Sequence, residues 1–179
     1  MKNLFKFMMT AAMMVVAVMS LTACSSDDET DESGNSGIGN VLSIDGKNYG
    51  NLEFAYFIDY GDGTSSLMFS NQNVASGITN TNGTLTFLSV RVPFATGIPT
   101  GTFSKDIDAD FDVNRNLSTQ TCELTGWSLN LVMTIAKSGN KYIVDVSSDD
   151  FHINGSDESG DGHKGSVVMH YEGIISVFE

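Results

Sequence analysis

Hydrophobic and polar residues alternate with a period of two along most of the chain from residue 41 onward. No segment there shows the 3.6-residue spacing of an amphipathic helix. Alternation of this kind is typical of strands that cover a core with one face and meet solvent with the other. The clearest case has apolar residues at Trp127, Leu129, Leu131, Met133 and Ile135. The pattern therefore predicts an all-β domain.

Long strands dominate the predicted C-terminal half. Ser138-Gly139-Asn140 separates the strand above from a returning one, which predicts a hairpin. A final strand follows, and its apolar face contains Val167, Met169, Tyr171, Ile175 and Val177. Each of these three strands should span about 12 to 14 residues, longer than usual, so we expect them to bend. Glycine inside a strand often marks a kink, and Gly126 and Gly173 are the natural bend points.

Shorter strands are predicted in the N-terminal half. One strand has an apolar face made of Leu52, Phe54, Tyr56, Ile58 and Tyr60, and Leu67 and Phe69 face inward on the next. The apolar positions shift register within residues 84–92, which predicts a β-bulge near Phe87. Together the patterns predict a single antiparallel domain of about eight to ten strands, either barrel-like or a sandwich, over residues 39–179.

The first residues have the order of an export signal. Lys2 and Lys6 come first, an apolar stretch runs from Phe7 to Met19, and small residues lead to Cys24. The apolar stretch is shorter than the roughly 20 residues that a membrane-spanning helix needs. We therefore expect residues 1–23 to be a removable signal peptide.

The tetrad Leu21-Thr22-Ala23-Cys24 resembles the bacterial lipobox motif. The resemblance implies that Cys24 becomes the lipid-bearing N-terminus, and that several acyl chains then anchor the protein to a membrane. The acidic run directly behind Cys24, residues 27–32, is similar to the surface-export signal of Bacteroidota lipoproteins. It implies an outer-membrane lipoprotein of the cell envelope that faces outward, although a solvated spacer would have the same composition.

Residues 24–38 contain charged, hydroxyl and glycine residues in excess, so we expect a lipidated, disordered acidic tether. The signal peptide contains two of the nine basic residues and no acidic residue, so the mature chain would carry a net charge of −15. That charge argues against nucleic acid as a partner. The chain has two cysteines, and lipidation would occupy Cys24. That leaves one cysteine, Cys122, for the folded domain, and a disulfide needs two, so we expect none within the domain.

Two acidic segments are candidate calcium sites. Asp106, Asp108, Asp110 and Asp112 alternate like the start of a calcium loop, but Phe111 and Leu117 occupy the positions where an EF-hand needs glycine and glutamate. A solvated acidic edge is the alternative. Asp157, Glu158 and Asp161 form the second segment, and a charged hairpin loop would need the same residues. No other cofactor is indicated.

No catalytic motif is present, so we expect no enzymatic activity; the alternative is an active site made of residues that only folding brings together. His170 with Glu172, two residues along on one strand face, is the best local acid–base pair. Aromatic residues could stack on sugars, but the alternation assigns all five candidates to the core: Tyr56, Tyr60, Trp127, Tyr142 and Tyr171.

These observations favour a lipid-anchored, non-enzymatic binding or adhesion module whose ligand lies outside the cell or in the envelope. The ligand class, whether glycan, peptide or protein, stays open. One alternative is a lipocalin-like carrier of a small apolar molecule, although lipocalins have a tryptophan near the start of the domain. Another is an envelope or pilus assembly subunit that completes its sheet with a neighbour's strand.

Overall fold

The structure is a computed structural model that describes residues 39–75, 83–94, 97–155 and 162–178. The predicted signal peptide and tether lie outside these residues. The described part of the chain contains no helix and is all-β, as predicted. Its strands are β1 (Val41–Ile44), β2 (Lys47–Asn51), β3 (Phe54–Asp59), β4 (Ser65–Ser70), β5 (Thr84–Val92), β6 (Gly101–Phe103), β7 (Asp108–Asn116), β8 (Leu124–Ser128), β9 (Val132–Ser138), β10 (Lys141–Gly155), β11 (His163–Gly173) and β12 (Ile175–Phe178).

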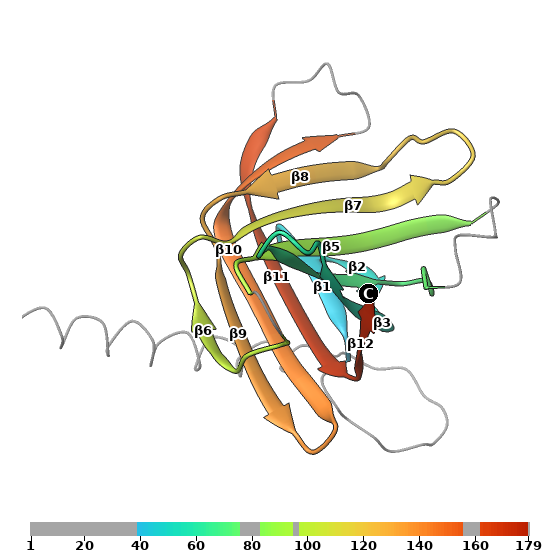
Figure 1. Ribbon diagram of the computed structural model, residues 1–179. Coiled ribbons are helices and arrows are strands. Elements are labelled where there is room, and N and C mark those ends of the chain that lie inside the picture. The colour runs from blue at the N-terminus through green and yellow to red at the C-terminus, as the bar shows by residue number, and fades with distance from the viewer. Residues whose placement is uncertain (1–38, 76–82, 95–96, 156–161, 179) are drawn as a thin grey trace, which may run out of the picture. The chain divides into compact units, whose positions relative to one another are not determined.

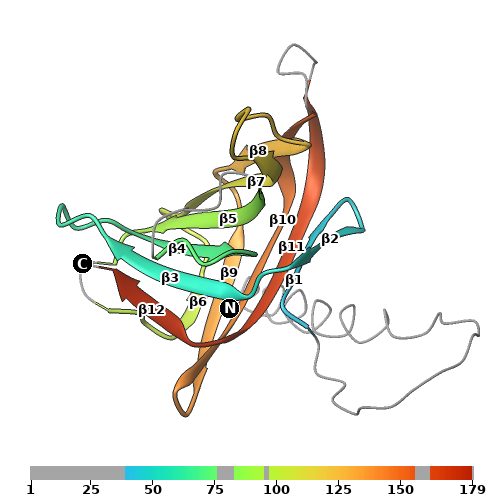
Figure 2. The same cartoon turned by 90° about the vertical axis from the view of Figure 1, so that its right-hand side faces the viewer.

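The strands form one curled sheet, which Figures 1 and 2 show from two sides. Its main path runs β12-β3-β4-β5-β7-β8-β10-β11-β1-β2, and β6 and β9 branch from β10. Most neighbours are antiparallel, but β12 and β3 are parallel. The fold is therefore a mixed, curled sheet and not the purely antiparallel one that the sequence predicted.

The prediction of about eight to ten strands is too low, because the described residues form twelve. One missed strand, β6, has only three residues, too few to show an alternation. In addition, two stretches that read as continuous strands are each divided by a bend, one into β8 and β9 and the other into β11 and β12.

At the first bend, between β8 and β9, the sheet divides into two branches, and we call this point the fork. Along one edge of β10, residues 152–155 pair with β8 and residues 141–147 pair with β9. Ser128 occupies the fork and is 1% exposed. Its hydroxyl accepts a hydrogen bond from Asn130 N–H (3.0 Å) and lies 3.1 Å from the carbonyl of Asp150. Ser148 donates to the Asn130 carbonyl at 2.6 Å. These bonds replace the strand pairing that is lost between β8 and β9.

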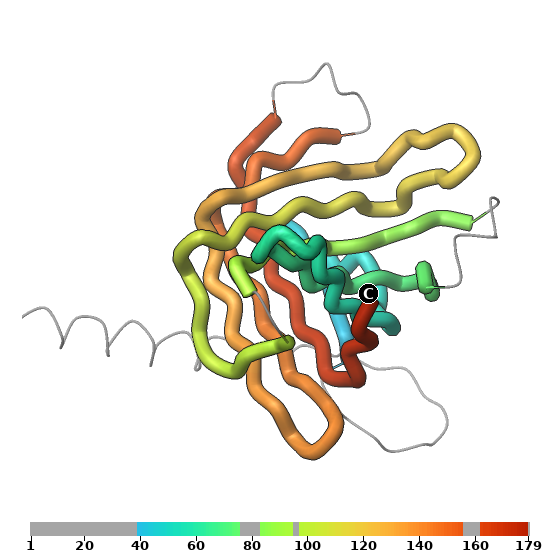
Figure 3. Tube along the Cα trace, in the orientation of Figure 1, coloured from blue at the N-terminus to red at the C-terminus, as the bar shows by residue number. Residues whose placement is uncertain are grey.

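The second bend lies at Gly173, as the sequence predicted. There β11 ends, and the chain continues as β12, which pairs with β3 and forms one end of the main strand path (Figure 3). A Cβ atom on Gly173 would lie 2.5 Å from the Tyr171 hydroxyl oxygen. Gly126 does not mark a bend. It is needed for close packing, because a Cβ there would lie 2.6 Å from the ring of Phe111.

The inner face of the curled sheet encloses one hydrophobic cluster. Its members come from strands throughout the chain, including Leu42 of β1, Phe69 of β4, Phe111 of β7, Val146 of β10 and Met169 of β11. The predicted inward faces of β4 and β11 are confirmed by this cluster. So are the β9–β10 hairpin and the bulge, since the register between β5 and β7 shifts between Leu85 and Phe87.

The predicted face of β3 is wrong. Ala55 and Phe57 point into the core cluster, whereas Tyr60 is 53% exposed. Tyr56 is buried on the opposite side, where its ring meets Phe178 edge-on at a centroid distance of 5.6 Å. Both faces of this strand are apolar, so alternation alone could not identify the inner one.

Candidate functional site

The outer face of the sheet has an exposed aromatic surface at Trp127. Asp110 of β7, Trp127 of β8 and His152 of β10 are direct cross-strand neighbours on this face. Trp127 is 51% exposed, and its ring lies 5.6 Å from the His152 ring at an angle of 44°. Thr125 and Asn154 form the next cross-strand pair on the same side. We call Asp110, Thr125, Trp127, His152 and Asn154 the Trp127 platform.

The sequence placed Trp127 in the core, and the structure corrects this. Inward and outward residues alternate within β8 and within β9, but the chain bends between the two strands, at residues 129–131. Odd-numbered residues therefore face outward in β8, as Trp127 does, and inward from Leu131 onward. Ser128 takes the inward position that a continuous strand would give to an apolar residue. Of the five aromatic candidates, Trp127 and Tyr60 are exposed. Ser128 looks in the sequence like an ordinary outward-facing polar residue, so nothing there indicated the bend that follows it.

Three acidic side chains alternate along β7 beside the platform. Asp108 is 3.7 Å from the Arg91 guanidinium, and Asp112, which is 8% exposed, is held by Arg115 at 2.8 Å. Asp110 lies between them, and no described residue forms a hydrogen bond or salt bridge with its carboxylate. The platform therefore has one carboxylate with unused hydrogen-bonding capacity.

The electrostatic surroundings of Asp110 disfavour its charge. Removal of water by the neighbouring strands raises the pKa of the Asp110 carboxyl, and the charges of Asp112 and Asp108 raise it further. Arg91 opposes this rise without cancelling it. The carboxylate remains accessible to solvent from the outer face. A positive charge placed beside Asp110 would relieve both the repulsion and the loss of water.

The structure places the first predicted calcium segment on the outer side of β7. Asp108, Asp110 and Asp112 share one face of the strand, while Asp106 lies before the strand in a left-handed backbone conformation, with φ of +57°. Among the described residues, no three His, Cys, Asp or Glu side chains converge as a metal site requires. Asp157, Glu158 and Asp161 lie outside the described residues, so calcium binding there stays a prediction.

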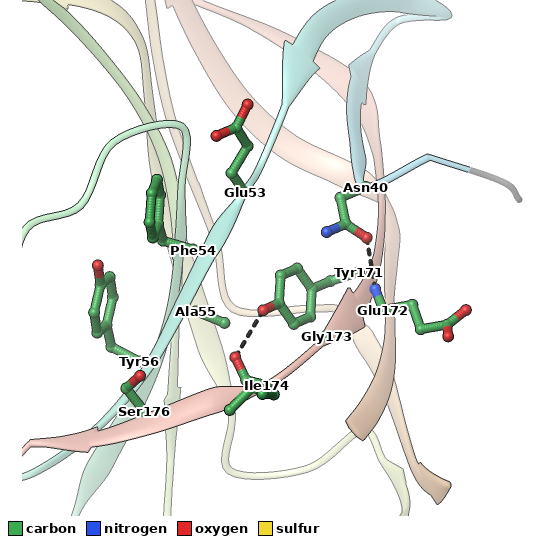
Figure 4. A pocket seen from close by; sticks show the side chains of 10 residues that line it. All are labelled: Asn40, Glu53, Phe54, Ala55, Tyr56, Tyr171, Glu172, Gly173, Ile174 and Ser176. Carbon is green, nitrogen blue, oxygen red and sulfur yellow. Dashed lines mark hydrogen bonds between the residues drawn. The ribbon is translucent and has the colours of Figure 1, made fainter. Parts of the chain in front are cut away.

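A groove of about 380 Å³ lies between β3 and the β11–β12 corner (Figure 4). Phe54 and Ala55 line one side, and Tyr171 and Ile174 line the other. The Tyr171 hydroxyl donates to the Ile174 carbonyl at 2.8 Å, and burial, together with Tyr56, raises the pKa of that hydroxyl. Glu53 and Glu172 bring two carboxylates to an otherwise mainly apolar lining.

Two of the three histidines, His163 and His170, pair with acids that the sequence did not indicate. His170 Nδ1 lies 2.7 Å from Asp145 Oδ1, its cross-strand neighbour on β10, and Glu172 instead pairs with Lys141 at 3.3 Å. His163 Nε2 lies 2.8 Å from Asp45 Oδ2. Cross-strand partners depend on register, which a single sequence does not fix.

None of the described residues forms a helix that is long and apolar enough to cross a membrane. Comparisons with known proteins give no relative: no family model matches the chain, and no curated protein and no solved structure matches it either.

Proposed function

We propose that this protein is a lipid-anchored, non-enzymatic binding module of the bacterial cell envelope. Cys24 holds it on the outer membrane, the domain faces outward, and the Trp127 platform is its binding surface. The anchor is supported by the lipobox Leu21-Thr22-Ala23-Cys24 and by the acidic run that follows it. A barrel-like arrangement describes the domain best, because the sheet curls around one core and its last strand pairs with β3.

The observation that carries this proposal is the exposed Trp127 on a regular strand in the middle of a sheet. Large aromatic side chains that combine apolar area with a polar atom dominate binding surfaces. Here β7 and β10 flank the residue on both sides, so its backbone is fixed by strand pairing, and its ring lies 5.6 Å from the His152 ring before a ligand arrives. Such preorganisation lowers the entropic cost of binding.

The groove at the β11–β12 corner supports a carrier as a second candidate function. Its volume of about 380 Å³ falls in the usual range for small-molecule sites. However, it lies beside the core and not within it, it is open to solvent, and Glu53 and Glu172 line it. An apolar ligand would have to approach these carboxylates. The Trp127 platform combines its exposed ring with an accessible carboxylate at Asp110, an arrangement that suits a polar ligand, so we rank it first.

Intact cells that carry the full chain test the proposed function. Their adhesion is measured on immobilised collagen, mucin and a neutral plant polysaccharide, which together offer peptide and sugar ligands. We expect adhesion to at least one coating and a decrease of about tenfold with Trp127→Ala, because truncating an aromatic anchor removes most of its contact area. Cys24→Ser should abolish adhesion by releasing the protein from the membrane.

Leu129→Ala is the matched control, because Leu129 is 74% exposed and lies two residues from Trp127 outside the platform. It should leave adhesion unchanged. The proposal fails if the wild-type chain adheres to none of the coatings, or if Trp127→Ala and Leu129→Ala behave alike. It also fails if Cys24→Ser leaves the amount of protein on the cell surface unchanged.

A further inference from the structure

We infer that the Trp127 platform binds an arginine side chain of a basic protein segment, with the guanidinium stacked on the indole and hydrogen-bonded to Asp110. This ligand class rests on the proposed function, because it names what the same surface takes. The inference starts from two neighbouring groups on the outer face: an exposed indole, and a carboxylate with which no described residue forms a hydrogen bond or salt bridge.

The geometry of the pair suits a planar cation. Asp110 and Trp127 lie directly opposite each other in adjacent antiparallel strands. Side chains at such positions have Cβ atoms about 5 Å apart. A guanidinium lying over the indole face can therefore reach the neighbouring carboxylate. Arginine combines stacking on an aromatic ring with two parallel hydrogen bonds to a carboxylate, and lysine, a compact point charge, cannot do both.

The charges around the platform favour a cation and disfavour an anion. Arg91, Arg115 and Lys164 are the basic residues near it, and each already pairs with an aspartate, respectively Asp108, Asp112 and Asp150. Asp110 is the carboxylate left over in this pattern. A ligand cation beside Asp110 would give this aspartate the basic partner that Asp108, Asp112 and Asp150 already have. An anionic ligand would meet Asp108, Asp110 and Asp112 on the same strand face.

The net charge of the whole chain acts in the same direction. The mature protein would carry −15 charges, with only seven basic residues distributed over it. An excess of one sign raises the rate at which ligands of the opposite sign arrive, and added salt weakens this effect. A basic protein segment is thus steered toward the domain before the platform selects arginine.

Trp127 is the single tryptophan of the chain, so its fluorescence reports on the platform alone. Full-length lipidated protein in detergent micelles is titrated with a blocked peptide of alternating glycine and arginine. Two further peptides replace arginine by lysine or by citrulline, which keeps the shape of the guanidinium but has no charge. We expect saturable quenching by the arginine peptide, binding weaker by about tenfold for lysine and none for citrulline.

Variants separate the platform from general attraction by the acidic chain. Asp110→Asn should weaken binding of the arginine peptide by about tenfold, measured by fluorescence and calorimetry. Asp59→Asn removes the same charge from an exposed turn at the end of β3 and should leave affinity nearly unchanged. Trp127→Ala, followed by calorimetry alone, should abolish binding.

Equal binding of the arginine and citrulline peptides overturns the inference, as do equal effects of Asp110→Asn and Asp59→Asn. If the arginine peptide does not bind while Trp127-dependent adhesion to the polysaccharide persists, the ligand assignment is wrong and the proposed function stands. If Trp127→Ala changes neither adhesion nor peptide binding, both are wrong.

Discussion

Single residues in this protein are constrained by close approach as much as by hydrophobicity. Gly126 shows this, because a Cβ atom there would collide with both the Phe111 ring and the His152 carbonyl oxygen. Trp127, the next residue, therefore belongs to a strand that packs closely against Phe111 and β10. This packing fixes the position of the platform, and the hydrophobic pattern of the sequence does not reveal it.

We predict that Gly126→Ala destabilises the domain by about 1–3 kcal/mol, the usual cost of overpacking a core. The added Cβ would lie 2.6 Å from Phe111 Cε1 and 2.9 Å from the His152 carbonyl oxygen, so the sheet must shift. Urea denaturation measures the loss. Gly155→Ala is the control, since a Cβ there has no neighbour within 4 Å. Similar losses for both variants would show that strand propensity, and not packing, is responsible.

At the scale of elements, side-chain bonds fix the short strands to the long ones. The β1–β2 hairpin is an example. Asp45 and Gly46 form its two-residue turn with φ of +50° and +78°, which is the turn geometry that suits the twist of a hairpin. Asp45 also accepts hydrogen bonds from Ser166 N–H and from the His163 ring, so the turn is fastened to β11.

The hairpin attachment should depend on pH. The hydrogen bond from His163, followed by the one from Ser166 N–H, lowers the pKa of Asp45 below its ordinary value of 3.8. A carboxyl whose folded pKa is lowered stabilises the fold at pH values above 3.8, and the contribution disappears as the pH falls through the lowered pKa. Asp45→Asn keeps a residue that tolerates positive φ and removes the charge.

We therefore predict that wild type is more stable than Asp45→Asn at about pH 5, and that the difference shrinks as the pH falls below 3.8. Urea unfolding at a series of pH values measures the two free energies. Because both partners of the bond are well exposed, we expect a small difference. A difference that stays constant or grows toward low pH would rule out this role of the carboxylate.

At the scale of the whole molecule, the fork and the corner divide the sheet into branches that still share one core. Residues of the β7–β8 branch, such as Phe111, and residues of the β9–β10 branch, such as Met133, belong to the same hydrophobic cluster. The aromatic pairs Phe111–Phe151 and Phe69–Tyr171 connect strands across the interior. The branches are thus parts of one cooperative unit.

We predict a single unfolding transition for the full chain. Trp127 fluorescence reports on β8 and the fork, whereas far-ultraviolet circular dichroism reports on all strands, and the two urea curves should have the same midpoint. This follows from the shared cluster, because loss of one branch would expose core residues of the other. An earlier midpoint by fluorescence would mean that the β7–β8 branch unfolds independently.

The sequence by itself determined the features that depend on local pattern. Period-two alternation was sufficient for the all-β class, for the inward faces of β4 and β11, and for the β9–β10 hairpin. The change of apolar register at residues 85–87 was sufficient for the bulge. These features follow from which neighbouring side chains must leave water, so they can be read without knowing the partners of each strand.

The tertiary structure alone decided the features that depend on distant partners. The fork at Ser128 turned Trp127 outward, the corner at Gly173 made β12 parallel to β3, and the register brought Asp145, not Glu172, to His170. Among the described residues, β5 supplied Arg91 to Asp108 and Arg115 folded back onto Asp112, which left Asp110 as the carboxylate of its row without a salt bridge. Alternation gives each strand two faces, but only the bends and the pairing of the whole sheet decide which face meets solvent and which charges meet each other.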